Sequence, residues 1–115
     1  MKSKAAVAAL GALAQPSRLA IFRALVQAGP SGLAAGEIGR LTRLAPSSLS
    51  FHLKELAHAG LVRGTQDGRF IFYAADFDAM NALLSFLTEN CCGGEDCGVG
   101  CAPSSKRSAL KGGRS

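Results

Sequence analysis

GEIGRLTRLAPSSLSFHLKELAHAG, residues 36–60, is the stretch that decides the fold. Two apolar sets recur in it at helical spacing, first Ile38, Leu41 and Leu44, then Leu49, Leu53 and Leu56. Pro46 suits the first turn of the second helix, where a missing N–H costs nothing, and Gly60 suits a left-handed C-terminal cap. The pattern therefore predicts two short helices joined by a turn.

The outer face of the second predicted helix has an unusual composition. With about 100° per residue, the face opposite the leucine stripe carries Ser47, Phe51, Lys54 and His58, flanked by Ser48 and Glu55. Hydroxyl, aromatic and basic side chains of this kind contact phosphates and base edges in a major groove, as the second helix of a helix-turn-helix does. The alternative is a helical hairpin whose outer face has no partner.

Residues 59–76, AGLVRGTQDGRFIFYAAD, predict a β-hairpin. They contain one strand beginning at Val62 and a second, aromatic-rich strand over 70–73. Asp67-Gly68 between them favours a tight turn with positive φ. A helix-turn-helix followed at once by a hairpin is a winged helix. Arg63 and Arg69 lie on this wing, where they either contact backbone phosphate or the minor groove, or are solvated hairpin ends.

The chain resembles the ArsR/SmtB family of bacterial metal- and metalloid-responsive repressors over roughly residues 5–92. The motifs that carry this resemblance, in order, are Pro16-Ser17-Arg18-Leu19, Ile21-Phe22-Arg23-Ala24-Leu25, Gly36-Glu37-Ile38, Ser47 through Leu56, Ala59-Gly60-Leu61-Val62 and Gly68 through Tyr73. The resemblance implies a homodimeric winged helix that binds operator DNA and releases it when an effector binds. The expected class is mainly α with a β-hairpin wing and about five helices.

The expected DNA contacts combine the outer face with the resemblance. Ser50 and His52 join the set because Ser50-Phe51-His52-Leu53 matches the family's recognition-helix pattern, in which His52 could contact DNA or support the helix. The full expected set is Ser47, Ser48, Ser50, Phe51, His52, Lys54, Arg63 and Arg69. The expected partner is double-stranded operator DNA, and the net charge of +5 suits a polyanion without requiring one.

The ends of residues 1–92 predict further amphipathic helices. A first helix over about 2–14 has Val7, Leu10 and Leu13 at three-residue spacing, and a second over 16–28 turns Leu19, Phe22, Leu25 and Val26 inward. After the wing, Asp76 can cap a last helix from Phe77 to about Cys91, with the stripe Met80, Leu83, Leu84 and Leu87. In the resembling family the first and last helices form the dimer interface, so we expect Leu10, Leu13, Met80, Leu83, Leu84 and Leu87 to form it here.

The cellular setting is expected to be the cytoplasm. Lys2 and Lys4 before an Ala-rich run superficially resemble a signal peptide, but the run is short and leads directly into the second amphipathic helix. No apolar run is long enough to span a bilayer, so no membrane partner is expected. In a reducing cytoplasm the cysteines stay thiols.

Residues 93–115 form the second predicted region, a Gly-rich, basic tail expected to be mobile. All four cysteines, Cys91, Cys92, Cys97 and Cys101, fall within eleven residues in the spacing C-C-x4-C-x3-C. Thiolates select soft acceptors, and trivalent arsenic or antimony bonds three of them in a trigonal pyramid. We expect Cys91, Cys92 and Cys97 to be the ligands, with Cys101 as a possible substitute. No cofactor is expected for DNA binding itself.

Other effector sites of the family have no match here. The region GEIGRLTRL lacks a Cys-Val-Cys motif, and DFDAMNALLSFLTEN lacks the histidines of the zinc site on the last helix. The chain instead resembles the members whose arsenic thiols lie at the end of that helix. A four-thiolate zinc site remains an alternative, although the paired C-x2-C spacing usual for structural zinc is absent. A two-thiol methylarsenite sensor, a thiol redox repressor and four unliganded thiols also remain open.

One segment of the tail has the spacing of an enzymatic loop. Cys101 to Arg107 matches the C-x5-R spacing of a phosphatase loop. Such a loop needs a preceding strand and a following helix to aim its N–H groups and lower the thiol pKa. The Gly-rich and polar flanks favour neither, and Pro103 removes a donor, so no catalytic activity is expected.

Overall fold

The computed structural model describes residues 1–94. Cys97 and Cys101, with the predicted tail beyond position 94, lie outside these residues. In chain order the elements are α1 (Ser3–Leu13), α2 (Pro16–Ala28), β1 (Leu33–Ala34), α3 (Ala35–Thr42), α4 (Pro46–His58), β2 (Val62–Asp67), β3 (Phe70–Ala75), α5 (Phe77–Leu87) and a 3-10 turn (Cys91–Gly94). The predicted helix-turn-helix (α3–α4) and wing (β2–β3) are confirmed, and the fold is a winged helix-turn-helix.

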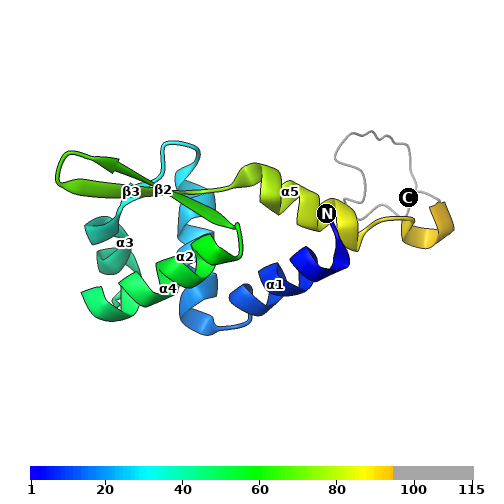
Figure 1. Ribbon diagram of the computed structural model, residues 1–115, viewed down its shortest axis with the longest axis horizontal. Coiled ribbons are helices and arrows are strands. Elements are labelled where there is room, and N and C mark those ends of the chain that lie inside the picture. Colours follow the sequence, from blue (N-terminus) through cyan, green and yellow to red (C-terminus); the bar gives the residue numbers. More distant parts are fainter. Residues whose placement is uncertain (95–115) are drawn as a thin grey trace.

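A small antiparallel sheet of order β1-β3-β2 forms the wing. Strand β1 pairs Leu33 with Tyr73, and β2 pairs with β3 from Val62↔Ala75 to Asp67↔Phe70. Gly64 pairs with Tyr73 and leaves room for its ring, since a Cβ at position 64 would lie 2.9 Å from Cε1 of that ring. Helices α3 and α4 and the wing lie toward one end of the molecule, whereas α1 and α5 extend toward the other (Figure 1).

Each of the five α-helices within residues 1–94 contributes side chains to one hydrophobic core. Its fully buried large side chains are Ile21, Leu25, Ile38, Leu53, Leu56 and Leu61. The predicted stripe of α4 is confirmed, since Leu49, Leu53 and Leu56 are each no more than 5 % exposed. The inward prediction for Leu19 is wrong, since this side chain is 43 % exposed, and Leu41 of the apolar set on α3 is 50 % exposed. On each helix the core takes only part of the apolar stripe, Ile21, Phe22 and Leu25 on α2 and Ile38 on α3.

Local signals define several helix ends. Gly60, with φ of 80°, closes α4 as a left-handed cap, because its N–H donates to Ala57 O and the Leu61 N–H donates to Leu56 O, each at 3.0 Å. The side chain of Asp76 accepts a 3.0 Å hydrogen bond from Ala79 N at the start of α5. Both predicted caps are confirmed.

Two predicted boundaries are wrong. Helix α5 ends at Leu87 and not near Cys91, since Thr88 leaves the helical conformation with φ of −102° and ψ of 8° and Asn90 adopts a φ of 58°. In the wing, the two turn residues are Gly68-Arg69 and not Asp67-Gly68, because Asp67 pairs with Phe70. Gly68, with φ of 64°, supplies the positive φ that the first turn position needs. Arg69 therefore stands at the tip of the wing.

No single helix among residues 1–94 is long and apolar enough to cross a membrane, and α1 and α2, which together would be, meet at 102°.

Candidate nucleic-acid interface

Helix α4 presents a polar and aromatic outer face. Ser47, Ser48, Ser50, Phe51 and Lys54 are all exposed, Phe51 by 56 %. They come together because Leu49, Leu53 and Leu56 anchor the opposite face in the core. Five of the expected DNA-contacting residues thus share one accessible surface.

The first turn of α4 is electrostatically suited to an anion. Its N-cap, Ala45, has no side-chain acceptor, and Pro46 occupies the first helical position. The first turn contains no acidic residue, so the positive end of the helix dipole is not neutralised locally. Backbone N–H groups at such an end can bind phosphate oxygens.

His52 occupies a different environment from its neighbours. It is half-buried, and its Nδ1 lies 3.4 Å from Nη1 of Arg18 on α2. Its ring also meets that of Phe51 edge-on, with 5.4 Å between ring centroids. This arrangement favours the supporting role that the sequence left open. Sequence reasoning missed Arg18 as the partner, because the two residues are 34 positions apart and share no periodic signal.

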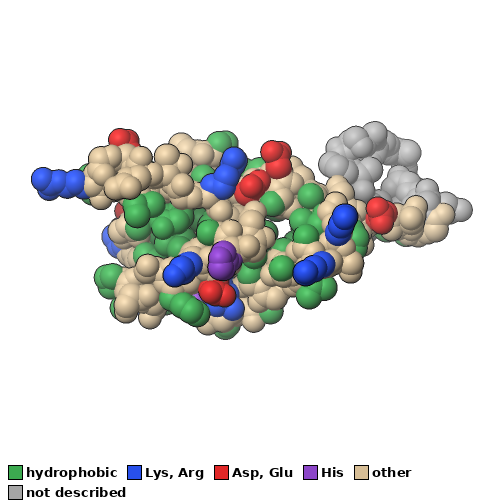
Figure 2. Space-filling model, in the orientation of Figure 1, with side chains coloured by type: hydrophobic (Ala, Val, Ile, Leu, Met, Phe, Trp, Pro, Cys, Tyr) green, Lys and Arg blue, Asp and Glu red, His purple; other side chains and the backbone are tan. Residues whose placement is uncertain are grey.

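The two wing arginines are placed differently. Arg69 is exposed at the tip, between strands β2 and β3. Arg63 is exposed at the base of the wing, where its Nε lies 3.7 Å from Oδ2 of Asp76, the N-cap of α5. Figure 2 shows a basic side chain at the tip of the wing and hydrophobic side chains gathered between the wing and α4. Exposed Phe70 and Ile71 next to Arg69 were not predicted as site residues.

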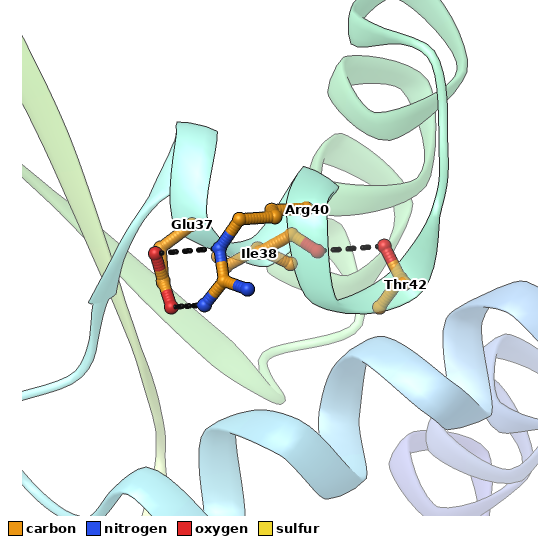
Figure 3. Close-up of polar contacts among 4 residues, drawn as sticks. All are labelled: Glu37, Ile38, Arg40 and Thr42. Atoms are coloured by element: carbon orange, nitrogen blue, oxygen red, sulfur yellow. Dashed lines mark hydrogen bonds and ion pairs between the residues drawn. The ribbon is translucent and has the colours of Figure 1, made fainter.

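Helix α3 supports the turn before α4. Arg40 donates two hydrogen bonds to the Glu37 carboxylate, and the Thr42 hydroxyl donates to the Ile38 carbonyl at 2.7 Å (Figure 3). The hydrogen bond from Arg40 lowers the pKa of the Glu37 carboxyl and raises the pKa of the Arg40 guanidinium. Arg43, with φ of 58°, then ends the helix in a left-handed conformation.

The opposite end of the molecule exposes apolar side chains. Val7 and Leu10 on α1, and Leu84 and Leu87 on α5, are each between 43 % and 66 % exposed. Of the other residues expected at a dimer interface, Leu13 and Met80 are half-buried and Leu83 is only 5 % exposed. Leu83 is thus a core residue of the protomer, so its substitution would disturb the fold as well as any interface.

The described cysteines lie just beyond α5. Cys91 is half-buried and Cys92 exposed, with their Sγ atoms 3.6 Å apart. Cys92 has a φ of 56°, so the backbone turns sharply at the second thiol. Within residues 1–94, no three His, Cys, Asp or Glu side chains are grouped as metal ligands would be. A third thiolate would have to come from Cys97 or Cys101.

Comparison with known proteins agrees with this architecture. Residues 13–65 match a family model described as a helix-turn-helix domain. The HTH-type transcriptional regulator YgaV of Escherichia coli is 36 % identical over 87 residues, covering 76 % of this chain and 86 % of YgaV. Reduced HlyU from Vibrio cholerae is 30 % identical with a TM-score of 0.61, covering 78 % of this chain and 92 % of HlyU.

A further structure shows the shared fold. Mb0332 from Mycobacterium bovis, described as a homodimeric winged helix-turn-helix domain and a possible ArsR-family regulator, has a TM-score of 0.61 at 24 % identity, covering 76 % of this chain and 81 % of that one. The resemblance seen in the sequence is confirmed. The chain belongs to a family of helix-turn-helix transcriptional regulators, which bind DNA and are not enzymes, and it has the winged-helix fold of ArsR/SmtB-type regulators.

Proposed function

We propose that the protein is a cytoplasmic repressor that binds two-fold symmetric operator DNA as a homodimer and releases it when trivalent arsenic binds. The observation that supports DNA reading is the outer face of α4, where three serines, Phe51 and Lys54 stand exposed together. Phe51 can contact a thymine methyl, and Lys54 can bind phosphate. Arg69 reaches the backbone or minor groove from the wing tip.

The homodimer is proposed from the apolar surface of α1 and α5. Exposed leucines on adjacent helices favour association with an equally apolar surface. A two-fold dimer would present two α4 helices to half-sites about one helical turn apart. Mb0332, which shares this fold, is described as homodimeric.

The effector site is proposed from the sulfur pair. Two Sγ atoms 3.6 Å apart in the turn after α5 can both bond one arsenic atom. Arsenite then needs one more thiolate, from Cys97 or Cys101. In this reaction As(OH)3 and three thiols give As(SR)3 and three waters. Antimonite, with the same valence, is expected to act in the same way.

Release requires that the arsenic-bound dimer fit the operator less well than the unbound one. The thiols lie directly after α5, which carries part of the proposed dimer surface. A bond from Cys97 to the arsenic held by Cys91 and Cys92 would constrain the segment after α5. This constraint would change the position of α5 in the dimer and with it the spacing of the two α4 helices.

The deciding experiment measures operator release by fluorescence anisotropy in a thiol-free reductant. Cys91→Ser and Cys92→Ser are each expected to abolish the response to arsenite and to methylarsenite. Cys97→Ser should abolish the arsenite response alone, because methylarsenite has only two exchangeable sites, unless Cys101 substitutes. Cys101→Ser should change little. Arsenite response in every single variant, with only zinc affinity reduced, would replace this proposal with the four-thiolate zinc site.

Thiol oxidation is a second candidate, favoured by the closeness of the same two sulfurs. A peroxide would oxidise two thiols to a disulfide and be reduced to water. The relative HlyU is described in a reduced form. Release by peroxide that a reductant reverses, combined with no release by arsenite under strict reduction, would establish this candidate instead.

A further inference from the structure

The side chain of Arg18 connects three helices. Its Nε donates to the backbone carbonyl of Ala12 at 2.7 Å, and its Nη1 lies 3.4 Å from Nδ1 of His52. Its backbone N–H donates to Oε1 of Gln15, the N-cap of α2, at 2.9 Å. One residue at the start of α2 therefore joins the last turn of α1 to the middle of α4.

The chemistry of both contacts suits a guanidinium. Ala12 belongs to the last turn of α1, where carbonyls lack partners within the helix and a cation is favoured by the helix dipole. A planar guanidinium offers donors in several fixed directions, so it can serve the carbonyl and the imidazole together. Because arginine only donates, a hydrogen bond in this contact runs from the Arg18 guanidinium to Nδ1 of His52 as the acceptor.

The packing of α1 against α4 beside this contact is incomplete. An open hollow of about 250 Å³ lies at the surface between the two helices, lined by Arg18, on the α1 side by Ala8, Gly11 and Ala12, and on the α4 side by Glu55, His58 and Ala59. A Cβ added to Gly11 would meet nothing within 4 Å. Because α1 supplies only small residues at this hollow, the Arg18 side chain provides the polar connection between α1 and α4 there, beside the core packing of Ala6 and Ala9.

We propose that Arg18 is a positioning residue that, through His52, sets the recognition helix α4 against α1. His52 lies between core residue Leu53 and exposed Phe51, and its ring contacts the Phe51 ring. Movement of His52 therefore moves the side chain proposed to read bases. Because α1 also carries exposed Val7 and Leu10, the contact couples the proposed dimer surface to the DNA-reading surface. This inference rests on the proposed role of the α4 outer face.

The test uses a duplex selected from random sequences by the wild-type protein, with a random-sequence duplex as reference. Anisotropy titrations at several salt concentrations give affinity, discrimination and salt dependence. Arg18→Met is expected to weaken operator binding roughly 2- to 30-fold. Affinity for the random duplex and the salt slope should not change, because Arg18 acts through His52 and not on phosphate. Arg23→Met, an exposed charge removed from the same helix, should leave discrimination unchanged.

Variants of His52 test the contact from its other side. His52→Phe keeps the ring but removes the acceptor, and should lose as much discrimination as Arg18→Met. His52→Asn, whose side-chain oxygen can accept near the Nδ1 position, should retain most of it. The double variant Arg18→Met/His52→Phe should discriminate as well as the poorer of the two single variants, since both substitutions remove the same Arg18–His52 contact.

Each contrary result has a distinct meaning. Additive losses in the double variant, or a salt slope reduced by about one in Arg18→Met, would overturn the positioning role, the latter because Arg18 would then contact phosphate directly. If Arg18→Met does not fold by circular dichroism, equal discrimination by His52→Phe and His52→Asn would overturn it instead. Failure of the wild type to select any duplex would overturn the DNA-reading proposal itself. Selection by the wild type with unchanged discrimination in Arg18→Met would overturn the positioning role alone.

Discussion

The outer faces of α4 and α5 expose apolar side chains to nearly the same degree, but the side chains around them differ. Phe51 on α4 is 56 % exposed, and Leu84 and Leu87 on α5 are each 53 % exposed. Phe51 stands among serines and Lys54, whereas the leucines lie near the apolar residues of α1. A single aromatic among donors and a cation suits a polyanion, and a continuous aliphatic surface suits another protein surface. The exposed fraction alone does not identify the partner; the neighbouring side chains do.

The largest expected effect comes from charging the α5 surface. Leu84→Asp combined with Leu87→Asp should weaken the proposed dimer roughly 100-fold or more, because a carboxylate buried without a partner in its interface is costly. Operator binding should fall with it. Sedimentation velocity measures the assembly, and anisotropy measures the binding.

Leu83→Asp provides the contrast. Leu83 is 5 % exposed within the protomer, so its substitution should unfold the chain and not merely separate two folded copies. Circular dichroism distinguishes these results. Intact dimers of the Leu84→Asp/Leu87→Asp variant would move the interface elsewhere on the molecule.

The next effect is on sequence discrimination. Phe51→Ala should reduce the preference for the operator over a random duplex by about 5- to 150-fold, the range for loss of one good base contact. Competition titrations with both duplexes measure it. Full discrimination retained in this variant would mean that the outer face of α4 has been assigned wrongly.

Lys54→Ala, on the same helix, should behave differently from Phe51→Ala. Loss of a phosphate contact weakens all sequences alike and reduces the slope of log affinity against log salt by about one. Anisotropy over a range of salt concentrations measures this slope. A loss confined to the operator would show that Lys54 contacts a base edge instead.

Asp76 links α5 to the wing, since it caps α5 and its Oδ2 lies 3.7 Å from Nε of Arg63 on β2. Asp76→Ala should lower the free energy of unfolding by about 1 kcal/mol through loss of the cap. Asp76→Asn keeps a capping oxygen and should cost clearly less. Urea denaturation of both variants measures the difference, and equal losses would point to the charge and not to the cap.

The smallest expected effect concerns Glu37 and Arg40 on α3. The hydrogen bond from Arg40 lowers the pKa of the Glu37 carboxyl below its ordinary value of 4.5. The contribution of the Glu37–Arg40 pair to folding stability is therefore fully present above pH 4.5 and is lost as the pH falls through the lowered pKa of Glu37. Both side chains are well exposed, so salt and water weaken the pair. Glu37→Gln should leave thermal stability at pH 7 nearly unchanged, and a large drop would contradict this.

Local sequence signals determined most of the fold. The leucine stripe of α4, the Gly60 and Asp76 caps and the strand beginning at Val62 all depend on residues within a few positions of one another. Such patterns specify a helix face or a chain reversal directly, because backbone geometry repeats over short distances. The outer face of α4 could be predicted from the same periodicity.

Tertiary structure decided what depends on distant segments. Because Asp67 pairs with Phe70, Arg69 is a turn residue and lies at the tip of the wing. Leu19 and Leu41 are exposed because no other element within residues 1–94 packs over them. Leu83 and Leu84 are adjacent in one stripe, but only the neighbouring helices determine that the first is buried and the second is not. The contact of Arg18 with His52 joins residues 34 positions apart. Periodicity tells which side chains share a face, whereas the packing of other elements decides which of them water still reaches.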